Sequence, residues 1–167
     1  SNDFQNGISE SSNLSEIREN VDTEFTNMIN HLSQHDIEHI VFDDIKGSGS
    51  PDAIFPNNWI TFHEEGIVVL YPMMSSKRRN ERRLDIIESL SKYGFSVSNT
   101  IDMSYLENKS EYLEGTGSMI LDRVSKKAYA SISSRTTKQG LSVFSDIMNY
   151  QIIEFTSTTD IPIYHTN

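Results

Sequence analysis

The feature that most constrains the fold is the alternation of short apolar runs with longer segments whose apolar residues repeat at helical spacing. The helical segments begin at Leu14, Leu84 and Leu141, and the first two extend to Leu32 and Tyr93. Short runs rich in β-branched and aromatic residues predict strands at 39–42, 53–55, 59–62, 67–71, 95–101, 119–121, 128–132 and 151–155. A strand–strand–helix–strand rhythm recurs along this order. It predicts an α/β or α+β fold in one domain over residues 1–167, after a polar start over residues 1–12.

Composition narrows the range of partners. The 24 acidic and 14 basic residues give a formal charge of −10, which disfavours nucleic acid because its binding depends on lysine and arginine. No apolar run approaches the roughly 18 residues that a membrane span needs, so we expect no membrane partner. The chain contains no cysteine, which excludes disulfides and thiolate metal sites and fits a cytoplasmic location.

A first candidate site lies between Pro51 and Trp59. It contains Asp52 and two consecutive amides, Asn57 and Asn58. Amides both donate and accept hydrogen bonds, which suits a neutral polar ligand better than an ion. The alternative is an ordinary turn, for which proline and asparagine are also typical.

A second candidate is basic. Five of the 14 basic residues fall between Lys77 and Arg83, at an expected helix start. At least one arginine there can turn inward, and a planar guanidinium can grip a ligand carboxylate with two hydrogen bonds. A solvated basic face is the alternative, although positive charge at a helix N-terminus is electrostatically unfavourable.

Two further residues suit acid/base chemistry. Glu114 precedes two glycines, Gly115 and Gly117, which let the backbone approach a ligand closely, although a plain hairpin turn fits the same pattern. His165 stands near the end of the printed sequence and could pair with Glu114. Neither a Walker lysine nor a His-Glu-x-x-His metal motif accompanies them.

The motifs, taken together, resemble the guanidino-group-modifying (pentein) superfamily, and within it the amidinotransferase-like citrulline-utilization hydrolases. The resemblance runs from about residue 3 to residue 167 and rests on five motifs: Pro-Asp-Ala-Ile-Phe-Pro-Asn-Asn-Trp, Leu-Tyr-Pro-Met with Arg-Arg-x-Glu-Arg-Arg, Leu-Glu-Gly-Thr-Gly-Ser-Met, Ser-Ser-Arg-Thr, and Ile-Tyr-His-Thr-Asn. It implies a fan of strand–strand–helix–strand units, of which about three of five fit here.

The resemblance implies a role for each motif. Glu114 would hold the reacting nitrogen group and His165 would be the general acid/base. The side chains implied as clamps for the α-carboxylate of an amino-acid substrate are Arg78, Arg79 and Arg135.

The resemblance also suggests which substrate is bound. Asn57 and Asn58 occupy the place where many relatives carry an acidic pair that binds guanidinium. We therefore expect citrulline rather than arginine as the substrate. Arginine stays an alternative, because Asp52 could supply the negative charge that a guanidinium needs. An arginine deiminase and an amidinotransferase are the enzyme alternatives, and a non-catalytic amino-acid-binding module is a third reading.

The superfamily's nucleophile is a cysteine, which this chain lacks. We expect the chain to be a fragment that is inactive by itself, with the nucleophile supplied by the remaining part of the same protein or by a partner chain. No metal and no organic cofactor are implied. Exposed strand edges would favour self-association.

Overall fold

A computed structural model describes residues 14–45, 49–50, 52–158 and 163–167. The chain divides into two compact units, one containing residues 14–45 and the other residues 49–167. Each unit is described by itself, and the single domain expected from the sequence stays a prediction. The polar start over residues 1–12 lies outside the described residues.

The first unit consists of one helix and an extended segment. Helix α1 (Leu14–Gln34) matches the predicted amphipathic helix. It ends where the Ile37 N–H donates to the Leu32 carbonyl and Asp36 takes a left-handed φ of 55°. The strand expected at 39–42 does not form: Ile40 and Phe42 are half-buried, but no neighbouring strand pairs with them in the described part of the chain. A strand needs such a neighbour for its backbone hydrogen bonds.

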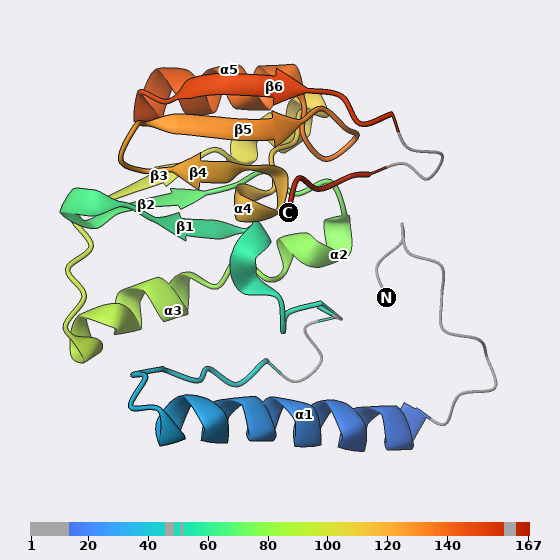
Figure 1. The fold of residues 1–167 in the computed structure, drawn as a ribbon, viewed down its shortest axis with the longest axis vertical. Helices are drawn as coiled ribbons and strands as arrows, with labels where there is room; N and C mark the ends of the chain where they lie inside the picture. Colours follow the sequence, from blue (N-terminus) through green and yellow to red (C-terminus); the bar gives the residue numbers. More distant parts are fainter. Residues whose placement is uncertain (1–13, 46–48, 51, 159–162) are drawn as a thin grey trace. The chain divides into compact units, whose positions relative to one another are not determined.

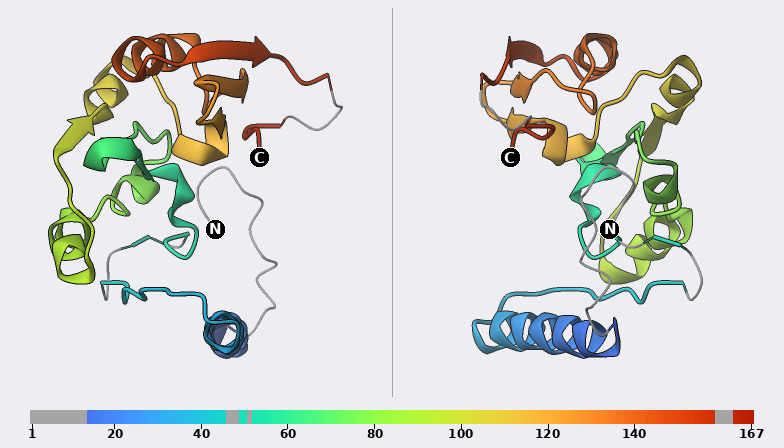
Figure 2. Two further views of the ribbon diagram at one scale, coloured as in Figure 1. Left: turned by 60° about the vertical axis from the view of Figure 1, so that its left-hand side comes forward. Right: turned by 90° about the vertical axis from the view of Figure 1, so that its right-hand side faces the viewer.

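The second unit contains two three-stranded sheets with the same connectivity (Figures 1 and 2). The first sheet consists of β1 (Ile60–Phe62), β2 (Ile67–Leu70) and β3 (Asn99–Asp102), with α3 (Leu84–Ser89) between β2 and β3. The second consists of β4 (Ile120–Asp122), β5 (Lys127–Ser131) and β6 (Gln151–Phe155), with α5 (Lys138–Met148) between β5 and β6.

In both sheets the first pair of strands is antiparallel and the second pair is parallel. Ile60 pairs with Leu70 and Val68 with Thr100 in the first sheet. In the second sheet, Leu121 pairs with Ala128, which also pairs with Ile152. The parallel pair requires a crossover, which the helix supplies. The described residues therefore contain two strand–strand–helix–strand units instead of the three expected, since the strands predicted at 39–42 and 53–55 are absent.

Short helical turns connect these elements. They are η1 (Pro56–Asn58), η2 (Glu64–Gly66), α2 (Ser76–Arg79), η3 (Leu90–Tyr93), η4 (Ser104–Lys109) and α4 (Gly115–Ser118). The sequence predicted that the basic segment starts a single helix, but the structure divides it between two. Helix α2 ends before Asn80, and Arg83 caps α3. Gly94 ends the predicted second helix with a φ of 86°, as its sequence position indicated.

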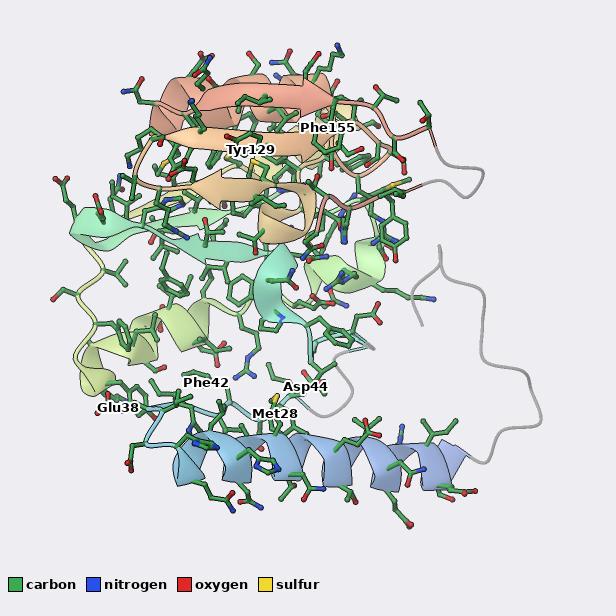
Figure 3. The ribbon with its side chains drawn as sticks, viewed as in Figure 1. Met28, Glu38, Phe42, Asp44, Tyr129 and Phe155 are labelled. Atoms are coloured by element: carbon green, nitrogen blue, oxygen red, sulfur yellow. The ribbon has the colours of Figure 1, made fainter. Side chains whose placement is uncertain are left out.

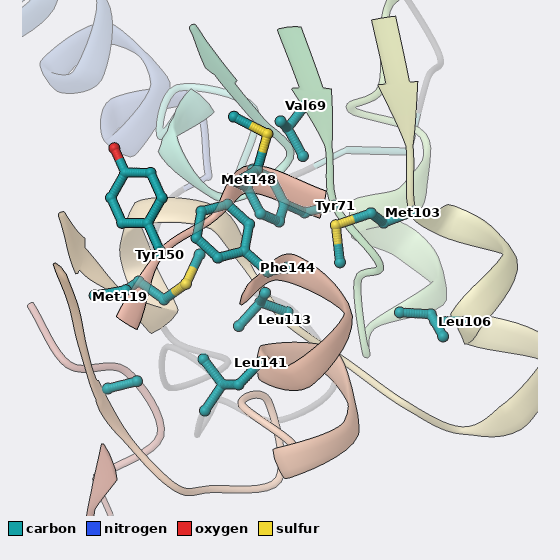
Figure 4. Close-up of a cluster of buried hydrophobic side chains, with 12 residues drawn as sticks. Val69, Tyr71, Met103, Leu106, Leu113, Met119, Leu141, Phe144, Met148 and Tyr150 are labelled. Atoms are coloured by element: carbon teal, nitrogen blue, oxygen red, sulfur yellow. The ribbon is translucent and has the colours of Figure 1, made fainter. Parts of the chain in front are cut away.

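One aromatic cluster fills the space between α5 and the strands. The Phe144 ring lies between those of Tyr71 and Tyr150, with centroid distances of 6.1 and 5.4 Å (Figure 4). Ala128 and Ala130 of β5 face the same cluster. Since successive side chains of a strand point to opposite sides, Tyr129 and Phe155, labelled in Figure 3, lie on the other face of the sheet.

The described residues include no helix that combines the length and the apolar character needed to cross a bilayer. The α+β class predicted from the sequence is confirmed.

Candidate functional site

The centre of the candidate site is the carboxylate of Glu114, whose residue is 0% exposed. Glu114 directly precedes α4, and its N–H donates to Ser118 Oγ at 2.8 Å. Gly115 follows with a left-handed φ of 47°, and a Cβ there would lie 2.6 Å from the Asn57 carbonyl. Glycine is therefore needed at the turn that directs the Glu114 side chain inward.

Four groups from distant parts of the chain contact this carboxylate. Oε2 accepts hydrogen bonds from His165 Nε2 at 2.8 Å, Asn58 Nδ2 at 3.3 Å and Arg135 Nη1 at 3.4 Å. Oε1 accepts from the Met74 N–H at 3.0 Å. The carboxylate oxygens are thus provided with donors although water has no access, as a buried charge requires.

These contacts decide the charge of Glu114. Burial alone would raise its pKa, but the hydrogen bond from His165, the positive charge of Arg135 and the Met74 N–H together hold the pKa below its usual range. Because an ionised carboxylate only accepts hydrogen bonds, Nε2 of His165 carries the proton in this pair. The arrangement is a charged carboxylate that orients an imidazole.

His165 reaches the site because the next residue, Thr166, is fixed by three hydrogen bonds. The Thr166 N–H donates to the Gly117 carbonyl at 2.8 Å, and its hydroxyl donates to the Ser118 carbonyl at 2.6 Å. The same hydroxyl accepts from the Ser131 N–H at 2.8 Å. The C-terminal segment accordingly lies beside α4 (Figures 1 and 2).

Close packing around Gly117 brings Asn58 and His165 together. A Cβ at Gly117 would lie 2.8 Å from Asn58 Oδ1 and 3.0 Å from His165 Cε1. Both contacts are shorter than van der Waals contacts allow, so any side chain at this position would displace the amide or the imidazole.

Arg78 is buried but does not touch the Glu114 carboxylate in this arrangement. Its Nε and Nη2 donate to the two carboxylate oxygens of Glu81 at 2.8 and 2.9 Å, and Nη2 also donates to the Phe55 carbonyl at 3.1 Å. Burial lowers the pKa of Arg78, but the Glu81 carboxylate outweighs this effect and the net pKa is raised. Arg78 therefore fixes the loop that leads to Asn58.

Arg79 is the most accessible of the three arginines predicted as clamps, with a side chain that is 31% exposed. Its Nε lies 3.2 Å from Glu107 Oε2 and donates to the Met73 carbonyl at 2.9 Å. Glu107 also pairs with Arg82 and accepts from the Met73 N–H at 2.8 Å. This ion cluster holds the segment from which Met74 reaches Glu114.

The two remaining predicted residues lie in the segment that leads to Asn58. Asp52 is half-buried in a turn, where the Phe55 N–H donates to its carbonyl at 2.9 Å. Asn57 is also half-buried, and its carbonyl accepts from Thr116 Oγ1 at 3.2 Å. Of the predicted residues, the structure brings Asn58, Arg135 and His165 into contact with the Glu114 carboxylate.

Sequence reasoning missed the residues that support this group. Ser118 Oγ accepts from the Glu114 N–H and donates to the Arg135 carbonyl at 3.0 Å. Glu107 and Thr166 act in the same indirect way. Ser118 and Thr166 both belong to motifs that the sequence singled out, whereas no local signal marks Glu107.

Within residues 14–45, 49–50, 52–158 and 163–167, no three histidine or acidic side chains gather as metal ligands would.

Several solved structures are similar to this chain. The N-terminal domain of ArgZ, an arginine dihydrolase from the ornithine–ammonia cycle in cyanobacteria, solved as a mutant bound to substrate, is 19% identical, with a TM-score of 0.53 over 70% of this chain and 40% of that one. The same domain covalently bound to a reaction intermediate is 18% identical, with a TM-score of 0.53 over 70% and 39%. A Pseudomonas aeruginosa dimethylarginine dimethylaminohydrolase mutant complexed with citrulline is 14% identical, with a TM-score of 0.48 over 68% and 42%.

The chain spans about 40% of the length of these solved proteins. No curated protein sequence matches it significantly. The likeness to the ArgZ domain confirms the predicted fold, a partial pentein fan.

A family model described as "N,N dimethylarginine dimethylhydrolase, eukaryotic" matches residues 1–167, the whole chain. The superfamily predicted from the five motifs is thereby confirmed. The chain belongs to the N,N dimethylarginine dimethylhydrolase family.

Proposed function

We propose that this chain forms part of the catalytic domain of a hydrolase that breaks a C–N bond at the planar carbon of a guanidino or ureido amino acid. The observation that carries the proposal is the 2.8 Å contact between His165 Nε2 and the buried, ionised carboxylate of Glu114. A carboxylate that orients an imidazole is typical of general acid/base sites.

In the proposed reaction, a thiolate attacks the planar carbon and forms a C–S bond. His165 then gives a proton to the nitrogen that leaves, and the C–N bond breaks. His165 next takes a proton from water, whose oxygen attacks the same carbon and releases the sulfur. His165 is an imidazolium before it gives the proton and again after it has taken one from water, and the Glu114 carboxylate stabilises this charged form.

The 167 residues contain no cysteine, so in this proposal the thiolate comes from other residues, in the same protein or in a partner chain. The printed chain contributes the proton-transfer pair and the amino-acid clamps. We accordingly propose that it is inactive alone and acts in the cytoplasm.

Arg79 is the clamp that the structure favours for the α-carboxylate of the substrate. Arg78 is bound to Glu81 through two hydrogen bonds, and the Arg135 side chain is only 2% exposed beside Glu114. The Arg79 guanidinium is the one that a carboxylate arriving from solvent can reach. A planar guanidinium suits such a partner.

Two substrates remain as proposals. The family description favours a dimethylarginine, which would give citrulline and dimethylamine. Citrulline, which would give ornithine, ammonia and carbon dioxide, is favoured by the neutral amides of Asn57 and Asn58 and by the contact of Asn58 with Glu114. Asp52, a carboxylate in the same segment of the sequence, supports a cationic guanidinium.

Product analysis decides between these reactions. The chain, combined with the cysteine-bearing part, is incubated separately with dimethylarginine, arginine and citrulline, and the amino-acid products are measured. Citrulline from dimethylarginine supports the first substrate, and ornithine from citrulline supports the second. No turnover of any of the three contradicts the proposal.

A matched pair of variants tests the role of His165. His165→Ala is expected to reduce kcat by about 10²- to 10⁴-fold, the usual contribution of a general acid/base. His39→Ala, at an exposed histidine of the other unit, is the control and should retain full activity. The alternative is a non-catalytic amino-acid-binding module, which calorimetry of the 167 residues with citrulline tests. Binding of citrulline in this measurement, together with no turnover by the combined protein, supports the binding module.

A further inference from the structure

Two side chains that contact Oε2 of Glu114 also contact the ring of Tyr164. The Arg135 guanidinium carbon lies 4.3 Å from the ring centroid. The His165 ring lies 4.8 Å away, centroid to centroid, at an angle of 64°. The first is a cation–π contact and the second an edge contact between aromatic rings, and both are attractive.

Tyr164 is itself fixed at its backbone but not enclosed in the core. Its carbonyl accepts a hydrogen bond from Ser133 Oγ at 2.7 Å. The residue is 36% exposed and lines a cavity of about 320 Å³ together with Ile132, Ser133 and Ile163. A change of this ring therefore leaves the aromatic core around Phe144 untouched.

The position of the ring matters because it gives Arg135 and His165 a shared contact in addition to the one that each makes with Glu114. The Arg135 Nη1 contact is long, at 3.4 Å, and provides little orientation by itself. A guanidinium lying on an aromatic face loses part of its rotational freedom, which keeps its charge beside the carboxylate.

We propose that Tyr164 is a positioning residue whose ring holds the Arg135 guanidinium and the His165 imidazole in the orientations in which both contact Glu114. The inference rests on the proposed function for the chemical role of this centre. Its geometry, however, can be measured without turnover.

The test is a carbon-13 NMR titration of the Glu114 side-chain carboxyl in the 167-residue chain and in three variants. In Tyr164→Leu, the Glu114 pKa should rise toward its usual range by more than the fitting error, because the contacts with His165 and Arg135 that lower it are weakened. Tyr164→Phe keeps the ring and should leave the Glu114 pKa unchanged. Tyr105→Leu is the control, since Tyr105 is similarly exposed and its ring faces Lys109.

The inference is overturned if Tyr164→Leu leaves the Glu114 pKa unchanged, or if Tyr164→Phe or Tyr105→Leu raises it equally. A second measurement needs no variant: in the unmodified chain, the side-chain protons of Arg135 over the ring should show upfield ring-current shifts. Ordinary shifts for these protons contradict the inference even if Tyr164→Leu fails to fold.

The two proposals can fail separately. Absence of turnover in the combined protein, together with the expected NMR shifts, removes the proposed function and leaves the role of Tyr164. Turnover that depends on His165, together with an unchanged Glu114 pKa in Tyr164→Leu, supports the proposed function and removes the role of Tyr164.

Discussion

The Nε2 atom of His165 lies 2.8 Å from Oε2 of Glu114, although 51 positions separate the two residues in sequence. The contact forms because Thr166 fastens the C-terminal segment to α4, the turn that follows Glu114. It places the His165 imidazole beside the carboxylate that orients it.

Removing the Glu114 charge should destabilise the fold. In Glu114→Gln, the Arg135 side chain, which is 2% exposed, loses its carboxylate partner, and breaking a buried ion pair costs about 3–5 kcal/mol. Urea denaturation at neutral pH measures the change in the free energy of unfolding. Glu88→Gln, at an exposed site of α3, should change it little, and a Glu114 variant as stable as that control contradicts the prediction.

The lowered pKa of Glu114 predicts a loss of stability in acid. Since the folded pKa lies below the unfolded one, the stabilisation is complete above the unfolded pKa and is lost as the pH falls through the folded pKa. Unfolding free energies measured from pH 7 to pH 3 should decrease over this range. The decrease should be smaller in Glu114→Gln, which cannot titrate there.

His63 should add a pH dependence at higher pH. Burial, reinforced by the charges of Arg123 and Lys126, lowers its pKa to about 4. The unfolded chain takes up this proton first, so stability should fall as the pH drops from about 6.5 to about 4. His63→Gln should flatten this part of the profile, and an unchanged slope argues against a half-buried, neutral His63.

Gly117→Ala should disturb the site without a change of charge. The added Cβ would lie 2.8 Å from Asn58 Oδ1 and 3.0 Å from His165 Cε1, so one of them has to move. We expect a reduction in kcat of about tenfold or more in the combined protein, since small displacements of catalytic groups are costly. Gly94→Asn is the control, because a Cβ there meets no atom within 4 Å and asparagine tolerates its left-handed φ. Equal activity of the two variants contradicts the prediction.

The start of α5 offers a test of stability alone. Thr137 Oγ1 accepts a hydrogen bond from the Gly140 N–H at 3.1 Å and also contacts Tyr112. Thr137→Val removes this cap and should cost about 1–2 kcal/mol, measured by urea denaturation. Thr137→Ser keeps the hydroxyl and should recover most of the loss, whereas equal losses in both variants would mean that the cap contributes nothing.

The regular elements could be predicted because local pattern decides them. Strand β6 has the predicted bounds, 151–155, and Gly94 ends its helix as expected. The runs at 39–42 and 53–55 are equally apolar, yet neither forms a strand in the described residues, because a strand depends on a neighbour that the run itself does not encode.

The candidate site could be predicted only where a motif marks it. The contact between Arg78 and Glu81 joins residues three positions apart, as on a helix. The partner of Arg79, Glu107, belongs to a separate segment and only tertiary structure reveals it. The roles of the eight predicted site residues stay predictions until the variants are measured.

The donors to the Glu114 carboxylate arrive from positions 56, 40, 21 and 51 residues away along the chain. Contacts of such large separation form late during folding, because each closes a long loop. We therefore expect the carboxylate to stay hydrated until these loops have closed. The environment of this side chain would then report the last step of folding, because only fully folded molecules bring all four donors to it.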